Sequence, residues 1–193
     1  TSLIRNVGIV NMFYILAVAY FVMMMLGHFL LKKPEGWVEA HGKSEFRLLT
    51  MFKKPIFIGI WLMFYINITC GLALISQEKD ILTIMGYTGI AGAVASLTAV
   101  FNAGGRLGYS AWADHVKDRD LIYKFIFALS AALSLATILT DGIANKYMIL
   151  AVILLCVVNA GYGGGFSNLP TLLSDRYGMK YVSQIHGLAL SAW

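Results

Sequence analysis

Three groups of polar and aromatic residues in this chain have the types and spacing of a ligand-binding surface. The first group is Tyr65, Asn67 and Thr69, which lie close together in an otherwise apolar stretch. An unsatisfied polar group in lipid costs several kcal/mol, so Asn67 must face protein or a water-filled cavity. Two roles fit this position: an interhelical hydrogen bond, worth about 0.6–2 kcal/mol, and the lining of a cavity.

The second group belongs to the segment NAGYGGGFSNLP. Tyr162 and Phe166 are four residues apart and would share one face of a helix. Three successive glycines and Pro170 are expected to weaken this helix locally, and non-helical backbone at membrane depth is tolerated only where it lines a cavity or is buried in protein. An aromatic pair beside flexible backbone suits a pocket for a small ligand, and a plain packing pair fits equally well.

The third group is Arg106 and Asp114 in the segment FNAGGRLGYSAWAD, where glycines allow tight backbone. Charges at a helix end can cap free carbonyls and bridge to a neighbouring helix. We expect this pair either to latch two helices together or to belong to an ordinary solvated loop.

Patterns of catalytic or metal-binding residues do not occur in the sequence. The four histidines have no metal-ligand spacing, and there is no phosphate-binding loop or Ser-His-Asp set. Cys70 and Cys156 lie in apolar stretches and are interpreted as small packing residues. We therefore expect a protein that is not an enzyme and that holds no cofactor and no metal.

Six apolar stretches must position these groups. Hydrophobic residues make up 59% of the 193 residues and charged residues only 13%, against about 25% charged residues in a soluble domain. Because a spanning helix needs about 20 mainly apolar residues, we expect spans at 7–31, 55–76, 82–103, 121–140, 147–169 and from 181 onward. The runs are continuous rather than alternating, which excludes a strand barrel. The predicted fold class is an all-α transmembrane helical bundle of about six spans.

The distribution of charge gives this bundle an orientation. The net charge is +5, and twelve of the fifteen basic residues fall on the side of the predicted loops 32–54, 104–120 and 170–180. The excess of basic residues marks the cytoplasmic side and places the start of the chain outside. Membrane topology explains these charges, so we expect no nucleic-acid partner. No acidic residue lies at mid-membrane depth in a complete predicted span, which argues against a proton relay.

The loop 32–54 contains Pro34 and Gly36 and reads as a linker between two membrane units. The chain does not begin with Met, and its last predicted span stops at Trp193 in mid-helix. We therefore expect a piece of a longer protein, truncated at both ends.

Several of these segments resemble the major facilitator superfamily, and within it the oxalate/formate antiporter family. The matching segments are KKPEGW, NITCGLALIS, FNAGGRLGYSAWAD, GYGGGFSNLPTLLSDRYG and QIHGLALSAW. The resemblance implies that residues 1–31 are the last helix of an N-terminal bundle and 32–54 the cytoplasmic central loop. Residues 55–193 would then be the C-terminal bundle from helix seven to the start of helix eleven, and the missing N-terminal bundle would be its partner.

The same resemblance implies a multi-pass secondary transporter of the plasma (inner) membrane that moves a small organic anion across the lipid bilayer by alternating access. The residues expected to line the substrate site are Tyr65, Asn67, Tyr162, Phe166 and Trp193. Arg106 and Asp114 are expected to form the cytoplasmic gate. A carrier for a neutral solute such as a sugar, and a non-transporting sensor, are the alternatives.

Two departures from the family pattern sharpen this expectation. The loop motif normally follows its Asp, here Asp114, with a basic residue, Gly and Arg, whereas Arg119 stands one place late. This predicts a weaker or rearranged latch. Oxalate binders of the family use an eighth-helix Arg and an eleventh-helix Lys, and residues 82–103 contain neither Arg nor Lys. We therefore expect a monocarboxylate such as formate, lactate or pyruvate rather than oxalate in exchange for formate.

Overall fold

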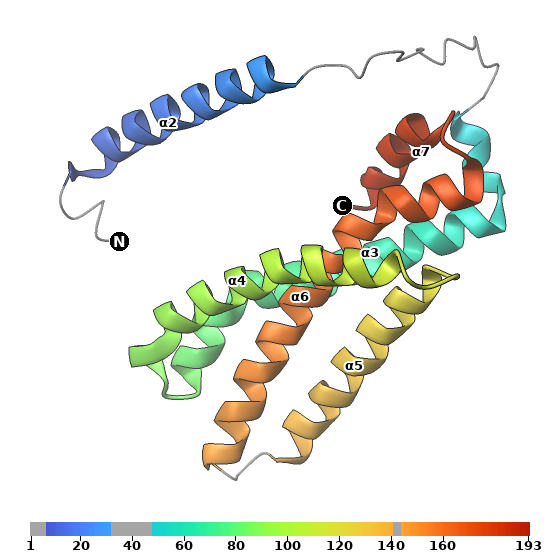
Figure 1. The fold of residues 1–193 in the computed structure, drawn as a ribbon. Helices are drawn as coiled ribbons and strands as arrows, with labels where there is room; N and C mark the ends of the chain where they lie inside the picture. Colours follow the sequence, from blue (N-terminus) through green and yellow to red (C-terminus); the bar gives the residue numbers. More distant parts are fainter. Residues whose placement is uncertain (1–6, 32–47, 141–143) are drawn as a thin grey trace. The chain divides into compact units, whose positions relative to one another are not determined.

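The computed structural model describes residues 7–31, 48–140 and 144–193 (Figure 1). The chain divides into two compact units, residues 1–43 and 44–193, and each is described by itself. The first unit contains one helix, α2 (Ile9–Leu30), which buries none of its residues. A helix that is apolar all round is stable only inside a large core or in lipid, so α2 has the character of a membrane span.

The second unit is entirely helical in its described part. Its elements are η1 (Leu48–Lys53), α3 (Pro55–Ile84), α4 (Thr88–Ala113), α5 (Asp120–Leu139), α6 (Ala144–Tyr177), α7 (Val182–Ala189) and η2 (Leu190–Ala192). Together with α2, the described residues contain five helices that are long and apolar enough to cross a membrane. The eight-residue α7, at the site of the expected sixth span, does not reach that length.

Local sequence explains where α3 begins and where α3 and α6 end. Pro55 occupies the first helical position of α3, where its missing N–H removes no helical hydrogen bond. Gly86 follows the other end with φ +85°, and its N–H donates to the carbonyl of Thr83 at 3.0 Å. Gly178 has φ +78° and ends α6 in the same way. Glycine adopts this left-handed conformation without the steric cost that a side chain imposes.

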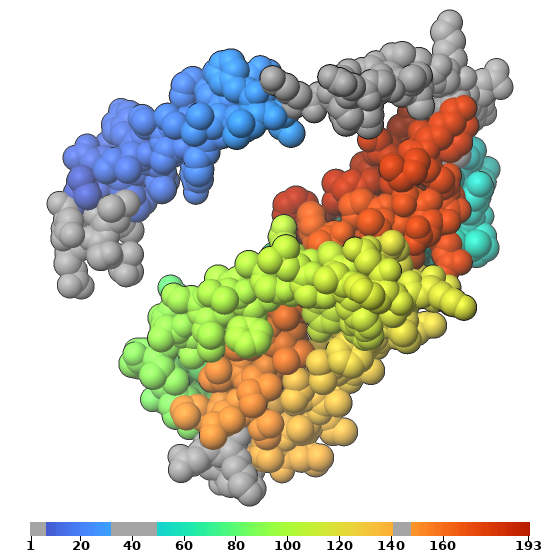
Figure 2. Space-filling model, viewed as in Figure 1, coloured from blue at the N-terminus to red at the C-terminus, as the bar shows by residue number. Residues whose placement is uncertain are grey.

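Helix α6 is the centre of the second unit and contacts α3, α4, α5 and α7. Figure 2 shows the side chains of α4 lying directly against those of α6. Helix α6 continues through its three glycines and through Pro170, and the expected local weakening of this segment stays a prediction. The glycines allow neighbouring helices to approach, since Gly163 faces the backbone of Asn102, Gly164 the ring of Tyr109, and Gly165 the amide of Asn67. Small residues serve this purpose in membrane helices.

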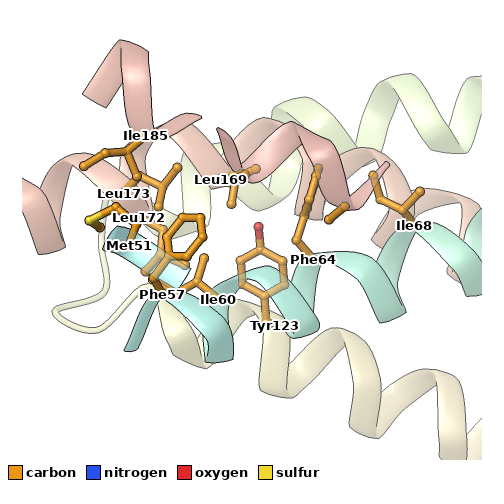
Figure 3. Packing of buried hydrophobic residues seen from close by; sticks show 12 residues of the cluster. Met51, Phe57, Ile60, Phe64, Ile68, Tyr123, Leu169, Leu172, Leu173 and Ile185 are labelled. Carbon is orange, nitrogen blue, oxygen red and sulfur yellow. The ribbon is translucent and has the colours of Figure 1, made fainter. Parts of the chain in front are cut away.

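The largest buried cluster lies where α3, α5, α6 and α7 meet (Figure 3). Phe57, Phe64 and Ile68 from α3 pack there against Leu169 of α6. Tyr123 of α5 is fully buried, and its hydroxyl points toward α6 and donates to the carbonyl of Gly165 at 2.5 Å. This bond satisfies the hydroxyl group, the only polar group of the Tyr123 side chain. Burial of that group in an apolar cluster without a hydrogen bond would be costly.

Helices α3, α4 and α6 are longer than the predicted spans, and this moves charged residues from loops into helices. The expected loop Gln77–Ile81 is the last part of α3, and residues 104–113 of the expected loop 104–120 continue α4. The helices therefore extend past the apolar run that the prediction followed. The predicted central loop 32–54 lies outside the described residues except for its end from residue 48, and residues 141–143 also lie outside them.

Candidate functional site

Three aromatic rings from different parts of the chain meet at one place, which we call the aromatic cluster: Phe64 of α3, Phe166 of α6, and Trp193, which follows η2. The centroids of Phe64 and Phe166 are 5.7 Å apart, and those of Phe166 and Trp193 are 5.8 Å apart with the rings nearly perpendicular. Phe64 is fully buried, whereas Trp193 is 66% exposed. The cluster thus extends from the buried core to an exposed side chain.

Arg106 adds a positive charge to the aromatic cluster. Its guanidinium carbon lies 5.4 Å from the centroid of the Phe166 ring, in cation–π geometry. Within the described ranges, Arg106 forms no ion pair with an acidic side chain. An exposed guanidinium that lies on an aromatic ring and has no carboxylate partner in the protein can donate two parallel hydrogen bonds to the carboxylate of a ligand.

The position of Arg106 corrects an argument made from the sequence. The absence of Arg and Lys was inferred for a helix ending at residue 103, but α4 continues to Ala113 and includes Arg106. Arg106 therefore lies in the helix that was expected to lack a cation. Arg106 lies seven residues before Ala113, the last residue of α4. At 1.5 Å per residue, this is about 10 Å from the helix end.

The aromatic cluster lies deep along its helices. Phe64 is nine residues from Pro55, and Phe166 is eleven residues from Tyr177. At 1.5 Å per residue, each lies about 14–16 Å from the nearer end of its helix, roughly half the thickness of a hydrocarbon core of about 30 Å. The cluster therefore lies well inside α3 and α6 rather than at their ends.

The other predicted site residues lie in different places. Tyr65 stacks on Trp61 with centroids 5.5 Å apart and rings parallel within 3°. Trp61 in turn donates from Nε1 to the hydroxyl of Ser191 at 3.0 Å, which joins α3 to η2. Tyr162 packs its ring against Gly71 of α3. Of the five predicted lining residues, the structure joins only Phe166 and Trp193 by direct ring contact.

Asn67 is 4% exposed and faces a separate cavity of about 400 Å³ between α3, α5 and α6. The cavity wall also includes Cys70, Ser130 and Ser134. The amide nitrogen of Asn67 is buried without a hydrogen-bond partner and packs against Gly165. The sequence left two roles for Asn67, an interhelical hydrogen bond and the lining of a cavity. The structure contains the cavity, and the amide nitrogen of Asn67 forms no interhelical hydrogen bond.

A network of ion pairs ties the end of α4 and the start of α5 to the end of α6. Arg119 binds Asp175 at 2.7 Å and Asp114 at 3.3 Å, and Arg176 binds Asp120 at 2.7 Å. We call these five residues the ion-pair network. The expected gate of Arg106 and Asp114 stays a prediction, but the two do not pair with each other, because Asp114 pairs with Arg119 and Arg106 lies on Phe166.

Sequence reasoning missed Asp175 and Arg176, although their segment SDRY was quoted as part of a motif. The available signal was a pair of opposite charges in the predicted loop 170–180, on the same side of the membrane as the charges around the predicted loop 104–120. Pairing across 56 residues, as between Arg119 and Asp175, requires the fold to bring the two helix ends together.

The aromatic cluster and the ion-pair network belong to a bundle of apolar helices, and the comparison with known families agrees with this architecture. The family model of the Major Facilitator Superfamily matches residues 1–193. No curated protein and no solved structure matches the chain significantly. The chain therefore belongs to the major facilitator superfamily of membrane transporters, and it is an integral, multi-pass membrane protein.

Proposed function

We propose that this carrier moves a small monocarboxylate, such as formate, lactate or pyruvate, by alternating access. The observation that carries the proposal is Arg106, whose guanidinium lies on Phe166 and has no acidic partner in the described part of the chain. A single cation compensates a single carboxylate, and an uncompensated buried charge is costly. The apolar rings of Phe166 and Trp193, which are partly buried and exposed respectively, would contact the short carbon chain of the substrate.

The ion-pair network supports the alternating-access part of the proposal. Two of its bonds, Arg119–Asp175 and Arg176–Asp120, join helix ends that are far apart in sequence and that any rocking of α6 against α5 would separate. Exposed ion pairs are worth about 0–1 kcal/mol each. Such weak bonds can hold one conformation and still break in every cycle, as a conformational gate requires.

The test uses the full-length carrier, reconstituted in vesicles and supplied with labelled pyruvate. Arg106→Gln is expected to abolish uptake, and Arg106→Lys to retain part of it, because the charge remains but the bidentate fork is lost. Lys117→Gln is the matched control, since it removes an exposed positive charge from the loop after α4.

Equal pyruvate uptake by Arg106→Gln and the unaltered carrier would contradict the proposal. Uptake of labelled glucose without any competition by pyruvate, lactate or formate would favour the neutral-solute alternative. Tight exchange of oxalate without uptake of monocarboxylates would show that the site compensates two carboxylates. Absence of all transport by a folded carrier would favour the non-transporting sensor.

A further inference from the structure

Glu78 is a buried carboxylic acid that the aromatic cluster does not use. The residue is 5% exposed and lies in α3 six residues before Ile84, about 9 Å from that helix end. A second apolar cluster, built from α3, α4 and α6, lies beside it. The members of this cluster are Leu82, Ala91, Val94 and Leu155. Acidic side chains are almost never buried in this way without a partner.

The only hydrogen-bond partner of Glu78 in the described residues is one hydroxyl group. The Thr98 Oγ1 atom lies 2.9 Å and 3.1 Å from the two carboxyl oxygens and 3.0 Å from the carbonyl oxygen of Ala95. A hydroxyl has one hydrogen to donate and can also accept. The Thr98 hydroxyl can therefore donate a hydrogen bond to an ionised Glu78. When Glu78 is neutral, the hydroxyl can instead donate to the carbonyl of Ala95 and accept a hydrogen bond from the O–H of Glu78.

No positive charge faces Glu78 in the part of the chain that the structure describes. On α3 its neighbours Lys79 and Asp80 are exposed, and Lys79 forms no described ion pair with Glu78. On α6 the thiol of Cys156 is buried within electrostatic range of the carboxyl group. The phenol of Tyr87, before α4, packs against the same apolar cluster. Neither group carries the positive charge that would compensate a carboxylate.

We propose that Glu78 is a proton-binding site that couples this carrier to a proton gradient. One carboxylate oxygen takes a proton from a hydronium ion in the water at the Ile84 end of α3, which leaves a water molecule, and forms an O–H bond. This O–H donates to Thr98, whose own hydrogen turns to the carbonyl of Ala95. Release of the proton to water reverses both changes, so atoms and charge balance.

Protonation would be linked to movement of α3, α4 and α6. A neutral Glu78 can stay among the apolar side chains, whereas a carboxylate without a cation requires water around it. The ionised form would therefore favour separation of α3 from α4 and α6 near Ile84. The inference rests on the proposed function for its cargo: one proton carried with one monocarboxylate makes a cycle without net charge, which the membrane potential does not oppose.

The first experiment is independent of any substrate. Infrared difference spectra of the full-length carrier in lipid vesicles, recorded between acid and alkaline pH, are expected to show the C=O band of a protonated buried carboxyl group. Glu78→Gln should remove this band, and Asp80→Asn, two residues away and exposed, should retain it. Thr98→Val should shift the band, because the carboxyl group loses its hydrogen-bond partner. A band that is absent from the unaltered carrier, or unchanged in Glu78→Gln, would overturn the proposal.

The second experiment separates proton coupling from transport. Vesicles with a pH gradient and labelled pyruvate measure net uptake, and vesicles loaded with unlabelled pyruvate measure exchange. Glu78→Gln is expected to lose the net uptake driven by the pH gradient and to retain exchange, which needs no net movement of protons. Survival of the pH-driven uptake in Glu78→Gln would overturn the proposal. If the unaltered carrier neither takes up nor exchanges pyruvate, the proposed substrate class fails, and the infrared band alone decides the role of Glu78.

Discussion

Alanine at Gly105 should force α4 away from α6, whereas alanine at the adjacent Gly104 should not. A β-carbon on Gly105 would overlap the backbone carbonyl group of Ala160 in α6, and backbone cannot yield as a flexible side chain does. A β-carbon on Gly104 would meet no atom within 4 Å. The two variants therefore differ in one physical respect, the close contact between two helices.

The expected magnitude follows from two opposing effects. Replacing glycine by alanine in a helix interior stabilises the helix by about 1 kcal/mol, and this gain is the same for both variants. Overpacking of a closely fitted contact costs roughly 1–3 kcal/mol. Gly105→Ala should therefore be less stable than Gly104→Ala by about 1–3 kcal/mol, since the common helix gain cancels.

Thermal unfolding of the purified carrier in detergent measures this difference. For a chain of this length each kcal/mol corresponds to about 2–4 °C in the unfolding midpoint, so the Gly105→Ala midpoint should lie several degrees lower. Equal midpoints would refute the view that α4 and α6 are held at the distance set by Gly105. A lower midpoint for Gly104→Ala alone would show that the packed face of α4 has been assigned incorrectly.

Three other changes test the helix contacts and ends. Tyr123→Phe removes the hydroxyl that bonds the carbonyl of Gly165 and should cost about 1 kcal/mol of unfolding free energy; an unchanged midpoint would contradict this bond. Arg119→Gln breaks two ion pairs, and its loss of stability, about 1 kcal/mol, should shrink at high salt. Lys117→Gln is the matched control. A loss of stability in Arg119→Gln that is the same at low and high salt would argue against an ionic contact. Gly86→Ala forces a side chain into a φ of +85° and should lower the midpoint by an amount equivalent to about 1–2 kcal/mol, whereas no loss would mean that the turn adopts another conformation.

The membrane class and the helical fold were predictable from the sequence, because lipid imposes a simple condition. The backbone must satisfy its hydrogen bonds internally, and each crossing segment must be apolar over about 20 residues. The apolar runs therefore predicted the five helices in the described residues that are long and apolar enough to cross a membrane. Their ends were less predictable, since α3 and α4 continue beyond the apolar runs to Ile84 and Ala113.

Those helix ends changed the chemistry of two residues. Glu78 was assigned to a loop and is a buried side chain of α3, and Arg106 was placed outside the helix in which it lies over Phe166. A hydropathy pattern does not locate such residues, because a helix can bury a charged side chain against neighbouring helices while its apolar residues face lipid. Burial depends on which helices lie nearby, and that information is not local in the sequence.

The sequence by itself determined the types of residue available for a site: aromatic side chains, a buried amide, and charges near helix ends. Only the tertiary structure decided which of them meet, because the rotation of each helix about its axis selects its contacts. Phe64 and Tyr65 are adjacent, yet successive residues of a helix point about 100° apart, so Phe64 contacts Phe166 while Tyr65 stacks on Trp61. The glycines of α6 were visible in the sequence as possible breaks; the approach of α3 and α4 made them points of close packing.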